Sequence, residues 1–186
     1  MQNISESLRR QREQILQDGS EEMLSRHTSL LEIAVISLYN RLVNSLKIDA
    51  AEFRSSGAVI ALGAFGRGLI GPRQPVSVLI LMSESSPWES GWVDEIIDPL
   101  LEAGWQVKLE TGQINHLLKR AEDDFEFFIR LLEGRYISGT RELADQLDNE
   151  LDSLIEKNRE SFLVELYKSV QERDELLHTP ESWLEP

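Results

Sequence analysis

The residues with the clearest chemical potential lie in a glycine-rich segment, GAFGRGLIG, between two apolar segments. It contains Gly63, Gly66, Gly68 and Gly71, with Arg67 among them. Glycines let backbone amides approach a ligand closely, and such a turn after a strand is typical of phosphate binding. Arg67 could then pair with the phosphate. In the alternative interpretation, the glycines only form a tight turn and Arg67 pairs with a carboxylate of the protein itself.

This segment resembles the nucleotidyltransferase domain of the bacterial PII uridylyltransferases. That family has a Gly-x-[Tyr/Phe]-Gly-Arg-Gly turn, then a proline, then Ser-Asp-[Val/Ile]-Asp-Leu-Leu at the start of the next strand. The residues that match the turn and the proline are Gly63, Phe65, Gly66, Arg67, Gly68 and Pro72. Residues 131–139 (LLEGRYISG) and 183–186 (WLEP) resemble two further segments of the family. The resemblance implies that the matching turn residues are the candidates for nucleotide or phosphate binding, and Arg73 adds a further cation near the mouth of the turn.

The chain departs from the family where its metal-binding aspartates would stand. The resemblance places Pro75 and Ser77 at those two positions. Carboxylates one residue apart on a strand point to the same face, where they can share a pair of magnesium ions. Proline has no side-chain ligand atom, and a serine hydroxyl is a weak, neutral ligand. We therefore predict no catalytic residues, no metal site and no cofactor, with magnesium expected only if other carboxylates replace the missing pair.

Two carboxylates are candidates for displaced metal ligands. Glu110 lies on the polar face of a predicted strand, and Glu84 lies just beyond another. In the alternative interpretation, both are solvated surface residues of a very acidic chain. The three histidines, His27, His116 and His178, have no ligand partners at a suitable spacing. We expect them at the surface or at helix ends, and no hydrolase triad is indicated.

Composition limits the classes of function. The chain has 186 residues, 41% of them apolar, which suffices for one folded core. Its formal charge of −14 disfavours broad binding to nucleic acid or to an anionic membrane. There is no cysteine, which excludes disulfides and thiolate chemistry. The first residues lack the apolar segment of a secretory signal, and no apolar run is long enough to span a bilayer, so we expect a cytoplasmic protein.

Hydrophobic periodicity indicates the elements that must position these residues. Continuous apolar runs predict strands at 58–62 and 76–82, and alternation predicts a third at 105–110. Helical spacing predicts helices at 4–17, 21–47, 92–101, 113–132, 143–155 and 162–170. The predicted fold is α/β, a small mixed sheet of the nucleotidyltransferase type flanked by helices. We divide the chain into N-terminal helices (1–50), a nucleotidyltransferase-like core (51–139) and C-terminal helices packed on that core (140–186).

The leading functional hypothesis is a catalytically degenerate uridylyltransferase-like domain that acts as a regulatory or binding module. Its expected partner is a PII-like or signalling protein, with weak nucleotide binding as a further possibility. One alternative is an active nucleotidyltransferase with displaced metal ligands. Another is a part of a larger signalling enzyme, because the family continues into further domains beyond this segment. A third is an interaction scaffold built from the long helices.

Overall fold

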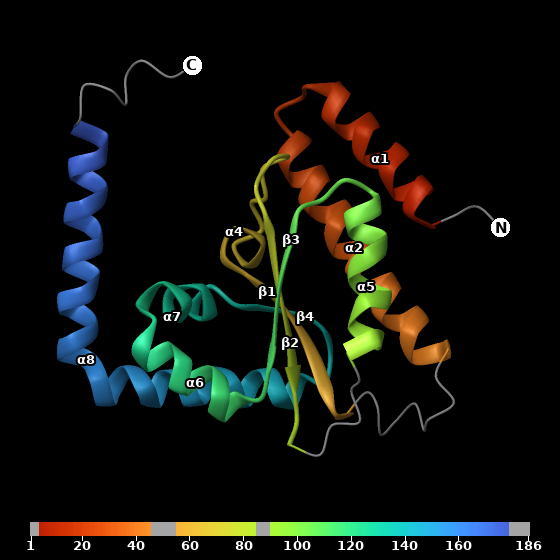
Figure 1. Cartoon of the computed structure of the whole chain (residues 1–186). Coiled ribbons are helices and arrows are strands. Elements are labelled where there is room, and N and C mark those ends of the chain that lie inside the picture. The colour runs from red at the N-terminus through yellow and green to blue at the C-terminus, as the bar shows by residue number, and fades with distance from the viewer. Residues whose placement is uncertain (1–3, 46–54, 85–89, 179–186) are drawn as a thin grey trace.

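The computed structural model describes residues 4–45, 55–84 and 90–178. Its centre is one sheet of four strands in the order β3-β2-β1-β4 (Figure 1). The strands are β1 (Gly57–Leu62), β2 (Val76–Met82), β3 (Val107–Gly112) and β4 (Arg135–Gly139). β1 is antiparallel to β2 and β4, whereas β2 and β3 are parallel, so the sheet is mixed. The predicted α/β fold with a small mixed sheet is thus confirmed.

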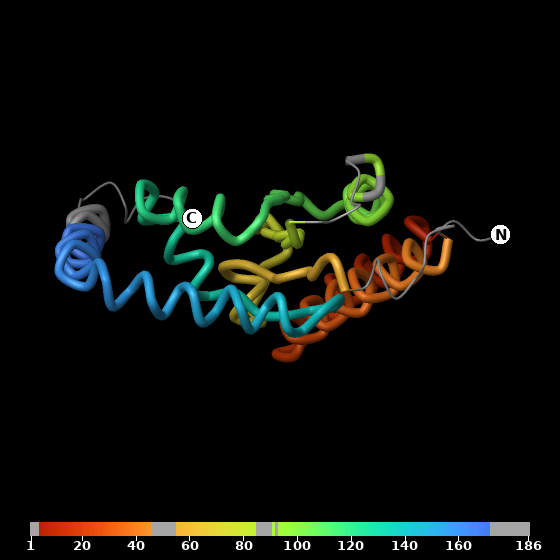
Figure 2. The backbone as a smooth tube through the Cα atoms, turned by 90° about the horizontal axis from the view of Figure 1, so that it is seen from below, coloured from red at the N-terminus to blue at the C-terminus, as the bar shows by residue number. Residues whose placement is uncertain are grey.

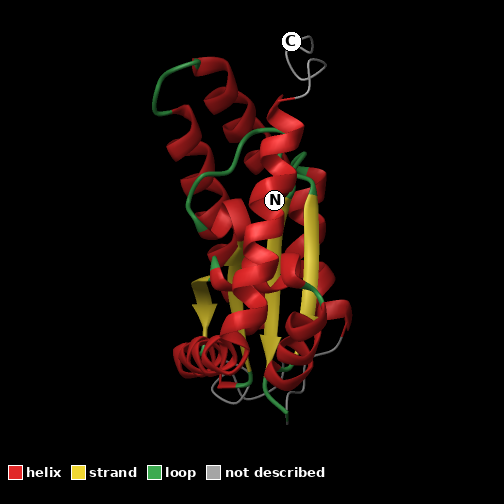
Figure 3. Cartoon of the chain, turned by 90° about the vertical axis from the view of Figure 1, so that its left-hand side faces the viewer, coloured by secondary structure: helices red, strands yellow, loops and turns green. Residues whose placement is uncertain are grey.

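Helices cover both faces of the sheet, which explains why β1 and β2 are continuous apolar runs (Figures 1 and 2). On one face lie α1 (Ile4–Asp18), α2 (Met23–Ser45) and α5 (Ser90–Glu102). On the other lie α6 (Ile114–Asp123), α7 (Phe125–Leu132) and the first half of α8 (Arg141–His178). Alternate residues of β2 divide between the two cores: Val78 packs with the first group and Leu79 with the second. Figure 3 views the sheet face-on, with its strands side by side and helices overlapping them.

Helix α8 consists of two arms that meet at Asn158, which has non-helical backbone angles. The first arm packs on the sheet through Leu147, Leu151 and Leu154. The second arm, residues 159–178, turns sharply and stands away from the sheet (Figure 1), and we call it the projecting arm. The sequence predicted two helices here, and the bend at Asn158 separates them.

Three features differ from the sequence prediction. β4 was assigned no structure, because its residues are mixed in polarity and only Ile137 is buried. The predicted helix at 113–132 is divided into α6 and α7 at Asp124, whose carboxylate accepts a hydrogen bond from the Phe127 amide at 2.9 Å. β3 begins at Val107 instead of Trp105, and Leu109 is exposed while Glu110 is half-buried. β3 is an edge strand, so its apolar face is incompletely covered.

His27 is fully buried, contrary to the expectation that the histidines lie at the surface or at helix ends. Its Nδ1 lies 3.2 Å from the Ile70 carbonyl oxygen, and its Nε2 accepts a hydrogen bond from the Trp105 indole at 3.1 Å. The neutral ring with its proton on Nδ1 satisfies both contacts. Burial lowers the pKa of His27, and the charge of Arg12 lowers it further, against the hydrogen bond to Ile70. His27 therefore joins α2 to the glycine-rich segment and to Trp105, which lies two residues before β3.

Candidate functional site

The glycine-rich segment leaves the central strand β1 and forms the short helix α4 (Gly63–Gly66). Gly63 adopts φ +55°, a conformation that favours glycine. Gly66 is needed for a different reason: a Cβ atom there would lie 1.9 Å from the carbonyl oxygen of Glu133. The turn is thus pressed against the end of α7. Its glycines have a structural explanation that requires no ligand.

Most of the backbone amides after α4 are engaged inside the protein. The amides of Arg67, Gly68 and Leu69 donate to carbonyl oxygens of residues 63–65 at 3.0 Å. The Ile70 amide donates to the Thr28 hydroxyl at 3.1 Å, and the Gly71 amide donates to Oε1 of Gln74 at 2.9 Å. These five amides cannot cradle a phosphate without breaking their present hydrogen bonds. Only the first-turn amides of α4 lack an intrahelical acceptor by the geometry of a helix.

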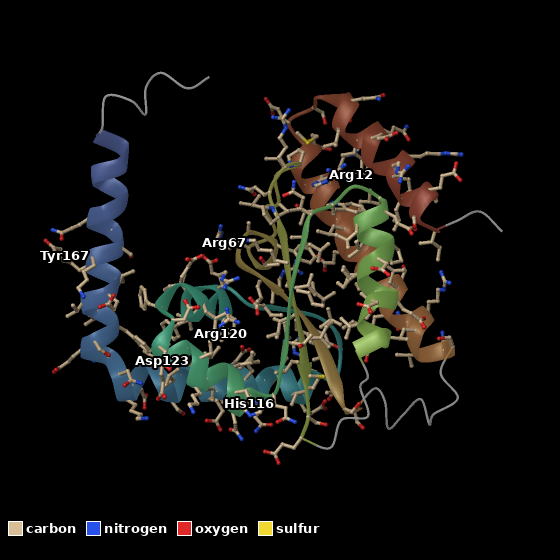
Figure 4. The ribbon with its side chains drawn as sticks, in the orientation of Figure 1. Arg12, Arg67, His116, Arg120, Asp123 and Tyr167 are labelled. Atoms are coloured by element: carbon tan, nitrogen blue, oxygen red, sulfur yellow. The ribbon has the colours of Figure 1, made fainter. Side chains whose placement is uncertain are left out.

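Arg67 forms an ion pair with Glu133, the residue that follows α7. Its side chain is 53% exposed and that of Glu133 is 27% exposed, so solvent screens much of this interaction. Arg67 thus has the carboxylate partner that the structural interpretation expects, and its phosphate-binding role stays a prediction. Figure 4 shows Arg67 beside α4, on the side of the sheet covered by α6 and α7.

A second arginine, which the sequence analysis did not single out, holds the turn in place. Arg135 of β4 pairs with both carboxylate oxygens of Glu32 on α2, at 3.0 and 2.9 Å. Its Nε donates to the carbonyl oxygen of Gly66 at 3.0 Å. The guanidinium therefore connects β4, α2 and the glycine turn. The sequence shows no signal for this role, because Glu32 lies 103 positions before Arg135.

The two remaining nucleotide-binding candidates of the turn region lie in different surroundings. Phe65 is fully buried in the core beneath α2 and α5, so its ring cannot stack on a base in the present structure. Arg73 is exposed in the loop before β2. The structure thus brings Gly63, Gly66 and Arg67 together with Glu133. It directs Phe65 into the core and leaves Arg73 at the surface.

The two positions at which the resemblance places the family's aspartates lie at the start of β2, beside the turn. Pro75 is exposed just before the strand, and Ser77 is half-buried within it. Ser77 is paired with Leu62 of β1 and Lys108 of β3. Its side chain shares the face of β2 with Leu79, which packs beneath α6 and α7. A lysine therefore stands beside the place where a metal pair would need anionic ligands.

Glu110 shares this face of the sheet, because it is paired with Leu79 in the register of β2 and β3. Its carboxylate lies 2.7 Å from Nη1 of Arg120 and 3.5 Å from Nη1 of Arg130. Its side chain is 21% exposed, so Glu110 is half-buried and its carboxylate is held by two arginines. Arg120 also packs over the ring of Phe127, with its Cζ 3.9 Å from the ring centroid (Figure 4). Two guanidinium groups thus pair with the carboxylate of Glu110, one of the two candidates for a displaced metal ligand.

Glu84 lies just beyond the end of β2 opposite Ser77. It is five positions past Leu79, the register partner of Glu110, which is roughly 16 Å along the strand at 3.3 Å per residue. Its carboxylate accepts a long hydrogen bond, 3.4 Å, from the side chain of Asn115. Both residues line a polar cavity of about 310 Å³ together with Ser83, Gln113 and Gln146. Glu84 and Glu110 therefore cannot hold one metal pair. Within residues 4–45, 55–84 and 90–178, no three carboxylates or histidines are grouped as metal ligands.

Among the described side chains, His116 belongs to no group of metal ligands either. His116 is exposed in the first turn of α6, and Figure 4 shows it near the foot of the sheet. The backbone of His178 ends α8. Among the helices of the described chain, none is both long enough and apolar enough to cross a bilayer.

The chain was compared with known proteins, and several enzymes are similar to it in sequence. No protein-family model matches the chain. A bifunctional uridylyltransferase/uridylyl-removing enzyme of Ruegeria pomeroyi is 30% identical over 122 residues, which is 63% of this chain and 13% of that enzyme. The enzyme of the same description from Novosphingobium aromaticivorans is 27% identical over 148 residues, 75% of this chain and 16% of that enzyme. One from a Bradyrhizobium species is 27% identical over 100 residues, 52% of this chain and 10% of that enzyme.

Among solved structures, a chain described as "Crystal structure of the toxin-antitoxin with AMP-PNP" aligns with a TM-score of 0.41 and 12% sequence identity. The alignment covers 70% of this chain and 97% of that one. The sequence matches to uridylyltransferases each cover only a small part of those enzymes. They confirm the resemblance stated above: the chain is homologous to a segment of the bifunctional uridylyltransferase/uridylyl-removing enzymes and carries a nucleotidyltransferase-like domain.

Proposed function

We propose that this chain is a catalytically inactive nucleotidyltransferase-like domain that acts as a regulatory or binding module. The observation that carries the proposal is the start of β2, where Pro75 and Ser77 stand at the positions of the family's two metal-binding aspartates. Transfer of a nucleotidyl group needs metal ions to neutralise the triphosphate, and metal ions need anionic oxygen ligands. Neither residue supplies one.

The charges around this position support the same conclusion. Glu110 shares the face with Ser77, but its carboxylate is already paired with Arg120 and Arg130. Binding a metal there would require breaking both ion pairs and bringing a divalent cation close to two guanidinium groups, which is electrostatically unfavourable. Lys108, opposite Ser77, adds a further positive charge. These neighbouring positive charges make binding of a divalent cation at this face unfavourable.

The glycine turn gives little support for strong nucleotide binding. Five successive amides are used inside the protein, and Arg67 already has a carboxylate partner. We therefore expect nucleotide binding to be weak and independent of magnesium. The proposed partner is a protein, PII-like or otherwise a component of signalling, in the cytoplasm. The whole activity of the longer relatives is not carried over to this chain.

The central experiment measures metal binding and transfer in the wild type and in a restored variant. Wild-type protein with magnesium or manganese and labelled UTP or ATP should transfer nothing to a PII-type protein above background. The double variant Pro75→Asp with Ser77→Asp should bind Mn²⁺ at least about tenfold more tightly than the wild type, because two carboxylates then share one face. Calorimetric titration with Mn²⁺ measures the difference.

A matched control separates a specific site from added negative charge. Asn149→Asp with Gln17→Asp places the same two charges at exposed, distant positions on α8 and α1. This control should leave Mn²⁺ binding as weak as in the wild type. Equal Mn²⁺ binding by the two double variants would show that β2 is not a metal-site scaffold.

Transfer by the wild type that is lost on Glu110→Ala would replace the proposal with the second candidate, an active enzyme with a displaced ligand. The position of Glu110 on the face of Ser77 is the observation that favours this candidate.

A further inference from the structure

A groove lies between α7 and the projecting arm of α8. It has a volume of about 350 Å³, and the apolar part of its walls consists of Phe125 and Ile129 on α7 and Leu166 on the arm. Leu166 is 44% exposed, so its side chain is available for a contact. Figure 4 shows Tyr167, the next residue, on the side of the arm away from α7. The groove therefore belongs to one side of the arm.

Aromatic rings hold the two walls of the groove together. The ring of Phe162, at the base of the arm, stacks on that of Phe128 of α7 with centroids 4.1 Å apart. The ring of Phe125 lies 5.9 Å from that of Phe128 and 6.0 Å from that of Phe162. These contacts favour one arrangement of the arm relative to α7. The groove is therefore formed before a partner arrives, which lowers the entropy cost of binding.

Both walls of the groove are helices, which decides the form of the segment that can fill it. A helix satisfies its backbone hydrogen bonds internally, so the walls offer no row of free amides and carbonyls to an extended strand. An extended segment buried here would leave its own backbone groups without partners, whereas a helix supplies them itself. α7 has eight residues, about 12 Å at 1.5 Å per residue, so the groove accommodates about two turns of a bound helix.

The rim of the groove has one carboxylate without a counterion. Glu165 and Lys168 both line the groove from the arm, but they pair with each other at 2.6 Å. On the opposite wall, Glu126 is exposed and forms no ion pair with another residue that the structure describes. The charged residues that line the groove, two glutamates and one lysine, thus leave the charge of Glu126 uncompensated.

The charges distinguish between the segments that could fill the groove. A second copy of the chain carries the same formal charge of −14, so long-range repulsion opposes its approach. The last residues of the chain, 179–186, include Glu181 and Glu185 and no basic residue, so they would add negative charge beside Glu126. A basic segment is attracted by the whole protein and by Glu126 at the rim. The apolar walls require that the same segment also present apolar side chains.

We propose that the groove between α7 and the projecting arm binds a basic amphipathic helix of a protein partner. The helix places apolar side chains, three or four positions apart, against Phe125, Ile129 and Leu166. A lysine or arginine at the edge of its apolar face pairs with Glu126. The inference adds an interaction surface to the binding module proposed above, and it does not depend on the chemistry of the β2 site.

The first experiment measures binding of a synthetic peptide to the full chain by fluorescence anisotropy. The peptide has about 14 residues, with leucines three and four positions apart and lysines elsewhere, so that its helix has an apolar and a basic face. One control peptide has the same composition with its leucines spread evenly around the helix, and a second has glutamate in place of every lysine. The wild type should bind the first peptide at micromolar concentration and each control peptide at least about tenfold more weakly.

The second experiment uses variants of the chain to locate the bound peptide. Leu166→Asp should weaken binding at least about tenfold, because a charge then stands against apolar side chains. Leu163→Asp is the matched control: Leu163 lies on the same arm and is 57% exposed, but it does not line the groove. Glu126→Lys should weaken binding about two- to tenfold, since it places like charges together. Glu150→Lys, the same change of charge at an exposed position of the first arm, should leave binding unchanged.

The outcomes decide the proposal. A wild type that does not bind the leucine–lysine peptide overturns it, and so does equal binding of the three peptides. Equal effects of Leu166→Asp and Leu163→Asp also overturn it, because the peptide then binds elsewhere on the acidic surface. A wild-type dimer that Leu166→Asp dissociates would make a second copy the occupant. Peptide binding that appears only after Trp183→Ser with Leu184→Ser would make residues 179–186 the occupant, and either result overturns the proposal.

Two further measurements keep these outcomes distinct. Far-UV circular dichroism shows whether each variant is folded, and sedimentation gives the mass of the wild type at the concentrations used. The Mn²⁺ titration of the β2 variants tests the proposed function by itself. Failure of peptide binding therefore leaves that proposal standing, and Mn²⁺ binding by the wild type would leave the groove standing.

Discussion

The glycine turn and the start of β2 belong to one sequence motif and lie side by side, yet their residues differ in how they contact the rest of the protein. In the turn, the residues that match the family all have contacts within the protein: Gly66 lies against Glu133, Arg67 pairs with that residue's carboxylate, and Phe65 fills the core. At the start of β2, the residues that differ are Pro75, which is exposed, and Ser77, which is half-buried.

The difference separates structural from chemical requirements. The resemblance assigns metal ligands to these two positions, and the sheet of this chain forms with a proline and a serine in their place. A glycine at position 66 cannot be replaced as easily, since a carbonyl oxygen occupies the place of a side chain. A matching glycine turn therefore identifies the fold and says little about chemistry. The predictions below test this contrast.

The largest effect is expected at Gly66. Gly66→Ala places a Cβ 1.9 Å from the carbonyl oxygen of Glu133 and 2.9 Å from that of Ala61, so the turn or the end of α7 must move. We expect the free energy of unfolding to fall by more than about 3 kcal/mol. Urea denaturation measures it. The control is Gly68→Ala, which has open space but φ +77°, and which should cost only about 1–2 kcal/mol. Equal costs for the two variants would mean that the close approach at Gly66 is not what the turn requires.

The next effect concerns the arginine that holds the turn. Arg135→Lys removes the paired hydrogen bonds to Glu32 and the bond to the Gly66 carbonyl, which a single ammonium group cannot make together. We expect a loss of about 1–2 kcal/mol in the free energy of unfolding. Arg141→Lys is the matched control, because Arg141 pairs with Asp145 while remaining 66% exposed. It should change stability by less than about 0.5 kcal/mol. If the two substitutions proved equally mild, the turn would not depend on Arg135.

A pH effect follows from His27, which fastens the far end of the turn through Ile70. Burial lowers the pKa of folded His27 below its ordinary value of 6.5, so below this pH the unfolded chain binds the proton more readily than the folded one. The contribution of His27 to stability is thus fully present above about pH 6.5 and is lost as the pH falls toward the lower, folded pKa. One proton limits the slope to about 1.4 kcal/mol per pH unit.

Urea denaturation at a series of pH values measures this slope. His27→Gln should lower stability and flatten the profile in the range just below the ordinary histidine pKa. His116→Gln, at an exposed position, should leave the profile unchanged. A profile that keeps its slope without His27 would assign the effect to other groups.

The sequence predicted the parts of this molecule that depend on local pattern. β1 and β2 were found because continuous apolar runs fit strands covered on both faces, and the helices were found from their spacing. β4 was missed because Arg135 and Ser138 give no strand pattern, and this short edge strand is stabilised by its pairing with β1. The division at Asp124 had a readable signal, an aspartate before an apolar helical segment, which is typical of a helix N-cap.

The candidate site was less predictable, because its character depends on contacts between distant residues. The sequence showed which carboxylates are missing, but not that Glu110 is paired with Arg120 and Arg130. It allowed both interpretations of Arg67, and it gave no sign that Glu133 would lie beside it. Ion pairs between elements follow from the packing of the chain, which no local pattern contains.

The smallest effect on stability is expected at Arg67. Substitutions there distinguish a purely structural turn from one that still binds phosphate. Because Arg67 is 53% exposed, its pair with Glu133 contributes at most about 1 kcal/mol. If Arg67 only completes the turn, Arg67→Ala and Glu133→Gln should each cost this small amount, and ATP, UTP or GTP should not stabilise the wild type at millimolar concentration. If the turn still binds phosphate, Glu133→Gln should strengthen nucleotide binding by freeing Arg67, whereas Arg67→Ala should weaken it about ten- to a hundredfold.

Calorimetric titration of the three proteins, with and without magnesium, distinguishes the two cases. We expect the first outcome, because the neighbouring amides are already engaged and no metal ligand stands at positions 75 and 77. Opposite responses of the two variants would show that the turn has a ligand as well as a structural role.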